Sequence, residues 1–351
     1  MSSRFPARAS TTTSSPTRQR RTTLGSPGHP RVRSDAVTTF DVTERPRVVG
    51  VIAVLCGGVG AARLLRAWQE RTSEELVGIV NVGDDTEMHG LNICPDLDSI
   101  TYHLSGQHNE ELGWGLRDES WRTMSRLELL GGETWFRLGD LDLATHLYRT
   151  GRLRAGATKS EVTREITARL GVTITLRPVS DDRLETRFAT EIGELSFQEY
   201  FVRHRHSVPV QRIWFDGADR ARPAPGVLDA LRDARRVVVA PSNPLVSIDP
   251  LLEVTGVREV LSERGDAIAI SPLIDGRALK GPADRLMREL GLEVNAVGVA
   301  RHYAPWLGTM VIDHQDASLR SLVGATGCDV VVAGTLLDDP AQVDELVAAI
   351  G

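Results

Sequence analysis

Three glycines follow the first long apolar run of the chain, at Gly57, Gly58 and Gly60. Glycine permits positive φ and close backbone approach, and a helix that begins behind such a turn offers unpaired N–H groups to a phosphate. The segment therefore predicts an anion site after the first core strand. Its spacing is neither that of a P-loop nor the full dinucleotide fingerprint, so a tight strand-to-helix turn without a ligand remains an alternative.

Carboxylates gather after the second apolar run, in residues 81–85 and again in residues 95–98. Mg²⁺ takes oxygen ligands and shares substrate phosphates, so acidic side chains beside a phosphate site predict a magnesium site. The alternative is helix capping by Asp96. Because Asp96 and Asp98 are two positions apart, they cannot share a face of a regular helix, and we expect one to cap while the other faces a ligand.

Two further segments carry polar groups that could do chemistry. Asp142 and His146 are four residues apart on one helix face and could offer two ligands to a metal. No further His or Cys lies nearby, so a capped helix with Arg137 free to meet an anion is favoured over zinc. Ser242 and Asn243 follow a late apolar run, where they either bind a base, ribose or phosphate or form an ordinary turn.

The apolar runs that would position these groups alternate with helical patterns. Residues 48–55 and 76–80 read as buried strands around a helix with Ala61, Leu64, Leu65 and Trp68 at helical spacing, which is a βαβ unit. Helices are also expected at 283–290 and 341–350. Further strands of the same kind are predicted at 236–240, 267–270, 297–299, 309–312 and 330–332.

These elements predict an α/β fold, a Rossmann-like doubly wound and mostly parallel sheet with a small α+β insertion. Residues 47–351 would form this domain, with the insertion at roughly 107–235. Within it, residues 174–176, 184–189 and 194–197 are expected to pair partly antiparallel. Residues 1–46 are rich in Ser, Thr, Arg and Pro and predict a disordered tail.

Composition narrows the class of protein. The chain has 351 residues, 41% of them hydrophobic, which suffices for a large core. A net charge of -6 argues against nucleic acid as a partner, and no apolar run reaches the 18 residues of a membrane span. Three widely spaced cysteines read as reduced thiols of a cytoplasmic protein. Small molecules are therefore the expected partners.

Five blocks taken in order resemble the 2-phospho-L-lactate transferase family, which begins the side chain of the deazaflavin coenzyme F420. The match runs from about residue 48 to the C-terminus. The blocks are G-D-D then G-L-x-x-x-P-D-L-D within residues 83–98, W-G at 114–115, G-D-x-D-x-A-T-H at 139–146, P-V-S-D-D at 178–182 and P-S-N-P-x-x-S-I at 241–248.

This resemblance implies a magnesium-dependent transfer between two small molecules. The terminal ribityl hydroxyl of the deazaflavin FO would attack a three-carbon acid activated as its guanosine diphosphate conjugate, and GMP would leave. Asp98 and Arg137 match positions associated with FO binding. Asp98 is the expected catalytic residue, which would orient or deprotonate the attacking hydroxyl.

The resemblance also assigns the nucleotide and metal sides. Gly57, Gly58 and Gly60 match the nucleotide-binding turn, and Ser242 and Asn243 match the same side of the site. The acidic loop matches the surroundings of Mg²⁺, and the expected metal ligands are Asp84 and Asp98. A homodimer is expected.

Two positions depart from the family pattern, and two other functions compete with the transferase. Val59 stands where Thr is common, which removes a hydroxyl, and Cys94 replaces a common Ser. A non-catalytic nucleotide-sugar-binding regulator of related fold is the main alternative. A nicotinamide-dependent dehydrogenase needs an acidic residue where this chain has Asn81. Lactyl, enolpyruvyl and glyceryl groups all remain candidates, and the arginine bias favours enolpyruvyl.

Overall fold

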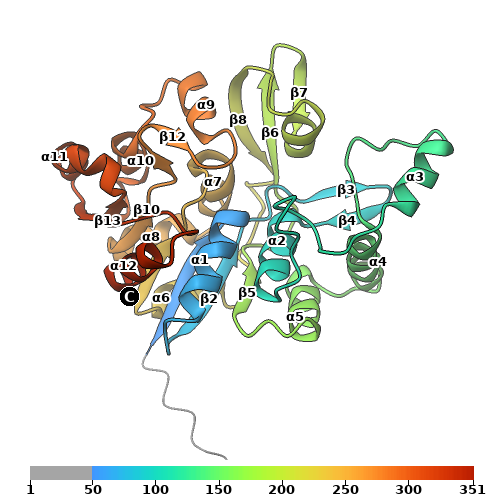
Figure 1. Cartoon of the computed structure of the whole chain (residues 1–351), viewed down its shortest axis with the longest axis horizontal. Coiled ribbons are helices and arrows are strands. Elements are labelled where there is room, and N and C mark those ends of the chain that lie inside the picture. The colour runs from blue at the N-terminus through green and yellow to red at the C-terminus, as the bar shows by residue number, and fades with distance from the viewer. Residues whose placement is uncertain (1–49) are drawn as a thin grey trace, which may run out of the picture. The chain divides into compact units, whose positions relative to one another are not determined.

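The computed structural model describes residues 50–351, which belong to one compact unit. The predicted disordered tail, residues 1–46, and the first residues of the strand predicted at 48–55 lie outside them. A seven-stranded parallel sheet forms the centre of this unit (Figure 1). In spatial order its strands are β14 (Asp329–Val332), β13 (Leu307–Ile312), β10 (Ala267–Ile270), β9 (Arg236–Val239), β1 (Val51–Cys56), β2 (Glu75–Val80) and β5 (Thr175–Pro178).

The order of the strands reverses once, between β1 and β9. From β1 the chain builds outward through β2 to β5, and it then returns to the other side of β1 and builds outward from β9 to β14. This is the doubly wound order of a Rossmann-like sheet, so the predicted fold class is confirmed. Ligands of such sheets bind outside the carboxyl ends of the strands at the reversal.

Helices cover both faces of the sheet because its strands are apolar on both sides. In β1, Ile52, Val54 and Cys56 pack into one core, while Ala53 and Leu55 pack into the other. The first core is closed by α1 (Val59–Gln69), α2 (Pro95–Leu104) and α12 (Pro340–Ile350). Helices that contribute to the second are α6 (Val227–Asp233), α8 (Val257–Arg264), α9 (Ala283–Glu289) and α10 (Ala296–Tyr303).

Smaller elements lie outside the main sheet. Figure 1 shows the hairpin of β3 (Thr86–Met88) and β4 (Leu91–Ile93) running toward α3 (Arg122–Leu129) and α4 (Asp140–Arg154). An antiparallel sheet joins β7 (Gly193–Ser196), β6 (Glu185–Thr190) and β8 (Val210–Asp216). The others are α5 (Lys159–Arg169), α7 (Asp249–Leu252), α11 (Arg320–Gly324), the β11–β12 pair (Leu273–Ile274, Arg277–Ala278) and short helical turns at Glu199–Arg203, Pro244–Ile248 and His314–Leu319.

Two predicted strands differ from the structure. Residues 297–299 are helical and belong to α10, because Asn295 caps the helix by accepting hydrogen bonds from the N–H groups of Val297 and Gly298. Residues 174–176 were expected in the antiparallel insertion, but β5 pairs parallel with β2 at the edge of the main sheet. The antiparallel pairing expected at 184–189 and 194–197 is confirmed in β6 and β7.

Two expectations drawn from composition can also be compared with the structure. Cys56, Cys94 and Cys328 are free and buried, which agrees with the prediction of reduced thiols. Among residues 50–351, no helix has the length and apolar character that crossing a bilayer would require.

Gly60 is required by close packing at the start of α1. A Cβ placed there would lie 2.4 Å from the backbone oxygen of Pro241, which cannot move away like a side chain. We expect Gly60→Ala to lower the free energy of unfolding by about 2 kcal/mol through overpacking. The matched control is Gly151→Ala in α4, where a Cβ meets open space and a gain of about 0.5–1 kcal/mol is expected. Urea unfolding of both variants would test this, and equal midpoints would contradict it.

Candidate active site

The glycine turn and the loop after β9 meet at the reversal of strand order. The backbone N–H of Gly57 donates to Ser242 Oγ at 3.3 Å, and a Cβ on Gly57 would lie 2.5 Å from the Cβ of Ser247. None of Gly57, Gly58 and Gly60 has a positive φ, so the predicted backbone reason was wrong in that part. Close approach is what requires glycine here.

The N-terminus of α1 has no side-chain cap. Its N-cap residue, Gly58, has no side chain to cap the helix, and the first intrahelical bond runs from Ala62 N to Gly58 O at 3.0 Å. The N–H groups of the first turn therefore lack intrahelical acceptors. Together with the helix dipole they form a site that attracts a phosphate.

Ser242 and Asn243 occupy the opposite wall of this turn. Ser242 is buried and holds the Gly57 N–H, so its hydroxyl already has one partner. The side-chain oxygen of Asn243 accepts from Leu245 N at 3.1 Å and caps the short helix Pro244–Ile248. Ser242 thus contacts the glycine turn, and Asn243 performs the turn-forming role left open as the alternative; nucleotide binding by either residue stays a prediction.

Asp84 and Asp96 form an acidic pair next to the glycine turn. The Asn81 Nδ2 donates to Asp84 Oδ1 at 3.1 Å and to Asp96 Oδ2 at 2.9 Å, which holds the two carboxylates together. The other oxygen of Asp96 approaches Gly58 so closely that a Cβ there would lie 2.7 Å from it. Asp96 does not cap α2, because Cys94 is its N-cap and no side-chain capping bond is present.

Burial raises the pKa of both carboxyl groups, Asp84 and Asp96. Desolvation raises the pKa of Asp96 to about 7, with a further contribution from Asp85. Desolvation, followed by repulsion from Asp96, raises the pKa of Asp84 well above its usual range. Two buried carboxylates with one shared amide donor are a donor set that suits a hard divalent cation. The residues present therefore fit Mg²⁺, with Asp84 and Asp96 as ligands, whereas Asp98 turns toward α4.

Lys159 neutralises the third carboxylate of the acidic loop. Its Nζ lies 2.6 Å from Asp85 Oδ2, and both side chains are largely buried. Burial opposes the charge on Lys159, but Asp85 outweighs it and raises the pKa of the ammonium. The lysine begins α5, where Thr158 and Glu161 form a capping box. The loop that carries Asp84 is thereby tied to α5.

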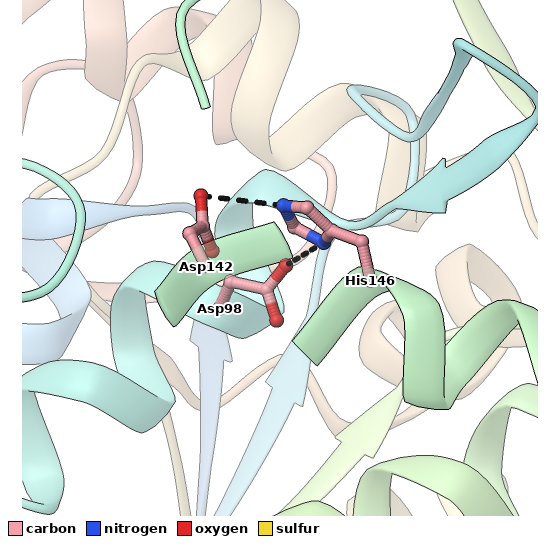
Figure 2. Close-up of side chains that lie close together, drawn as sticks. All are labelled: Asp98, Asp142 and His146. Carbon is pink, nitrogen blue, oxygen red and sulfur yellow. Dashed lines mark ion pairs between the residues drawn. The ribbon is translucent and has the colours of Figure 1, made fainter. Parts of the chain in front are cut away.

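Asp98 faces away from Asp96 and contacts α4. Figure 2 shows the His146 ring between two carboxylates, with one nitrogen toward Asp98 and the other toward Asp142. These pairs measure 3.7 Å from Nδ1 to Asp98 Oδ2 and 3.2 Å from Nε2 to Asp142 Oδ2. Arg149 also bonds Asp98 Oδ1. Arg149 adds a positive charge beside Asp98, so that these residues form a buried ion-pair network.

Arg137 is exposed and stacks on an aromatic ring. Its guanidinium carbon lies 4.3 Å from the centroid of Trp121, and Trp114 meets Trp121 edge to face at 6.0 Å. The helix that follows is capped from outside, since Glu119 accepts from the N–H groups of Leu141 and Asp142 at 2.8 Å. The predicted capped helix beside Arg137 is confirmed, with Glu119 as the capping group.

Sequence reasoning missed three charged residues of the site. Asp96 was considered as a cap, while Arg149 and Lys159 were not assigned. A signal existed for each of the two cations, because Arg149 lies three residues after His146 on one helix face and Lys159 is one of only two lysines in the chain. Neither signal predicts which carboxylate pairs with the cation, because the two partners are distant in sequence.

Comparisons with known proteins agree with this architecture. Residues 52–327 match the family described as 2-phospho-L-lactate transferase CofD. A phosphoenolpyruvate transferase of Streptomyces griseus is 43% identical over 284 residues, covering 79% of this chain and 89% of the relative. One of Mycobacterium sp. (strain JLS) is 40% identical over 320 residues, covering 85% and 97%. The chain therefore belongs to the CofD family and is a transferase.

A solved structure shows the same fold at lower similarity. A protein of the UPF0052 family from Bacillus halodurans superposes with a TM-score of 0.55 at 17% sequence identity, covering 85% of this chain and 98% of that one. At this identity the likeness concerns the fold alone, and it agrees with the Rossmann-like sheet.

Binding of Mg²⁺ should weaken as the pH falls. With the pKa of Asp96 raised to about 7, this carboxyl carries a proton at pH 6 and has lost it at pH 8. A metal must displace that proton, so we expect an affinity about tenfold lower at pH 6 than at pH 8. Isothermal titration calorimetry measures this directly. Asp96→Asn should abolish the binding, and Glu263→Gln, at an exposed position of α8, should leave it unchanged; equal affinity at both pH values would contradict the assignment.

Removal of the Lys159 charge should destabilise the acidic loop. Lys159→Met leaves Asp85 buried without its partner, and we expect the free energy of unfolding to fall by about 3 kcal/mol. Lys159→Arg keeps the charge and should recover most of that loss. Urea unfolding compares the two variants, and equal stability of Lys159→Met and the wild type would show that the pair is dispensable.

Proposed function

We propose that this transferase moves a phosphoenolpyruvyl group from its guanosine diphosphate conjugate to the ribityl hydroxyl of FO, releasing GMP, in coenzyme F420 biosynthesis. The curated relatives named phosphoenolpyruvate transferase are 43% and 40% identical to the chain over most of its length, which supports the enolpyruvyl group over the lactyl and glyceryl groups. The sequence blocks at 139–146 and 241–248 support a transferase over a regulator.

One observation carries the proposal. Asp96 and Asp98 lie in the first turn of α2, and Asp96 contacts the side of the glycine turn while Asp98 contacts α4. The first side offers an uncapped helix N-terminus and an unneutralised acidic pair, which suit a diphosphate with its cation. The second offers a carboxylate to a hydroxyl. A two-substrate reaction needs one binding region for each substrate, and α2 would lie between the two regions.

The nucleotide half would be held by backbone groups. The first-turn N–H groups of α1 would bind the diphosphate, because no side chain of the helix caps them. Asp84 and Asp96 would hold Mg²⁺, which when bound neutralises charge on the phosphate oxygens. Recognition by backbone N–H groups relies on amide dipoles, which need no reorganisation during the reaction.

The acceptor half would orient the attacking hydroxyl. Asp98 would accept a hydrogen bond from the FO hydroxyl and thereby direct its oxygen at the phosphorus that bears the enolpyruvyl group. A new phosphorus–oxygen bond forms, the bond to the GMP oxygen breaks, and the hydroxyl proton leaves through Asp98. Arg137 would bind FO from the other end of the half-site, beside Trp121.

Incubation with FO, Mg²⁺ and each of the three guanosine diphosphate conjugates tests the proposal by mass spectrometry. We expect the enolpyruvyl conjugate to give the phosphoenolpyruvyl ester of FO together with GMP. A product from the lactyl or glyceryl conjugate alone would change the assigned acid. No product from any conjugate would favour the nucleotide-sugar-binding regulator.

Substitution of Asp98 tests its role as the catalytic residue. Removing the side chain would strand the buried Arg149, so the near-isosteric Asp98→Asn is the better variant for keeping the fold. We expect turnover to fall by about 10²–10⁴-fold, the range for loss of a positioned acid–base group. Circular dichroism should show an intact fold, and normal turnover in this variant would exclude the assigned role.

A further inference from the structure

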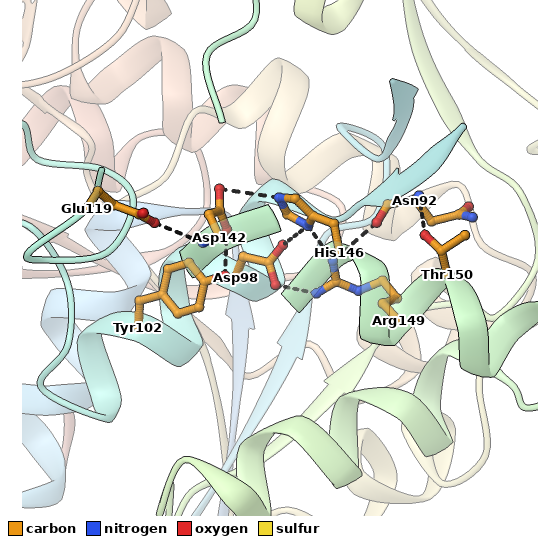
Figure 3. Close-up of polar contacts among 8 residues, drawn as sticks. All are labelled: Asn92, Asp98, Tyr102, Glu119, Asp142, His146, Arg149 and Thr150. Carbon is orange, nitrogen blue, oxygen red and sulfur yellow. Dashed lines mark hydrogen bonds and ion pairs between the residues drawn. The ribbon is translucent and has the colours of Figure 1, made fainter. Parts of the chain in front are cut away.

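We propose that His146 and Arg149 are positioning residues, which fix one oxygen of Asp98 and leave its other oxygen to the acceptor hydroxyl. The two residues lie three positions apart on α4 and both are almost fully buried. The inference rests on the proposed function, because it concerns how Asp98 meets FO. Figure 3 shows the network that carries it.

Arg149 joins three elements through one guanidinium. It bonds Asp98 Oδ1 on α2, the backbone oxygen of Asn92 on β4 at 3.3 Å, and Nδ1 of His146 on its own helix at 3.1 Å. Asn92 is held in turn, since its N–H donates to Thr150 Oγ1 at 2.8 Å. A planar fork with fixed donors can span these acceptors, whereas the single ammonium of a lysine cannot.

The contact with Arg149 determines which nitrogen of His146 carries the proton. A guanidinium can only donate, so Nδ1 accepts and the proton of the neutral ring is on Nε2. Nε2 then faces Asp142 Oδ2 at 3.2 Å. Asp142 is braced by the Tyr102 hydroxyl at 2.6 Å and, through its backbone N–H, by Glu119 at 2.8 Å. The ring is therefore hydrogen-bonded at Nδ1 only, while Nε2 lies within ion-pair distance of Asp142 without a hydrogen bond.

Asp98 Oδ2 is left as a buried acceptor without a hydrogen-bond donor among the described residues. The nearest ring nitrogen, Nδ1 of His146, is 3.7 Å away and has no proton to give in this tautomer. Buried polar atoms in native structures are nearly always paired, so an unpaired carboxylate oxygen calls for a donor that the chain itself does not supply. The hydroxyl of the acceptor is a donor of the required kind.

The same helix connects the two residues assigned to FO. Arg137 lies just before α4, whose N-terminus is capped by Glu119. His146 and Arg149, which fix Asp98, lie about two turns further along α4. A rigid helix thus sets the separation between the stacked guanidinium and the carboxylate, which is what an elongated acceptor with a ring system and a terminal hydroxyl requires.

Arg149→Lys tests whether Arg149 positions Asp98, and Arg152→Lys is the matched control. Arg152 is on the same helix and is likewise paired with a carboxylate, making two hydrogen bonds to that of Glu165. We expect Arg149→Lys to lower kcat about 30-fold, because small misplacement of a reacting group is costly, while KM for FO changes by less than about threefold. Arg152→Lys should leave both constants unchanged. Binding stoichiometry of FO, followed by its fluorescence, corrects each kcat for the fraction of folded sites.

His146 supplies a second, independent comparison. His146→Asn can present an oxygen where Nδ1 lies and should keep kcat within about threefold of the wild type. His146→Leu offers no acceptor, and its kcat should fall by about tenfold or more. Unchanged kcat in Arg149→Lys and His146→Leu, with an active wild type, would overturn the positioning role alone. A wild type that turns over none of the conjugates would overturn the proposed function, and the positioning role with it.

Discussion

The reversal of strand order between β1 and β9 is the constraint on which the site depends. It brings the glycine turn and the loop after β9 into contact, where the Gly57 N–H bonds Ser242 Oγ. Both loops must then pass without side chains between them, which explains why Gly57 and Gly60 cannot carry a Cβ. The first turn of α1 begins at this contact and has no side-chain cap.

Charge balance organises the rest of the site. The acidic loop and the first turn of α2 carry four carboxylates, and a cation neutralises two of them directly: Lys159 pairs with Asp85, and Arg149 pairs with Asp98. Asp84 and Asp96 share only the amide of Asn81, and burial raises the pKa of both. Because isolated buried charge is costly, the uncompensated pair is the part of the site that would hold the proposed cation, and the compensated Asp98 is the carboxylate proposed to meet the acceptor hydroxyl.

Much of the fold could be predicted because its signals are local. The apolar runs that became β1, β2, β9 and β10 are continuous, as strands buried on both faces must be, and shorter apolar runs marked β13 and the less buried edge strand β14. Residues 297–299 are equally apolar but too short to distinguish a strand from a buried helix, and the cap at Asn295 decided the matter. Residues 174–176 were recognised as a strand, but their partner β2 lies about a hundred positions earlier.

By itself the sequence determined the α/β class, the family, the glycine turn and the residue types that gather near it, because these depend on local patterns and on blocks of contiguous residues. Only the tertiary structure decided which charges meet. It joined Asp96 to Asp84 and Asp98 to Arg149, although Asp96 and Asp98 are neighbours on one helix turn. The reason is that side chains two residues apart point to different faces of a helix, and what each face meets is set by packing of distant elements.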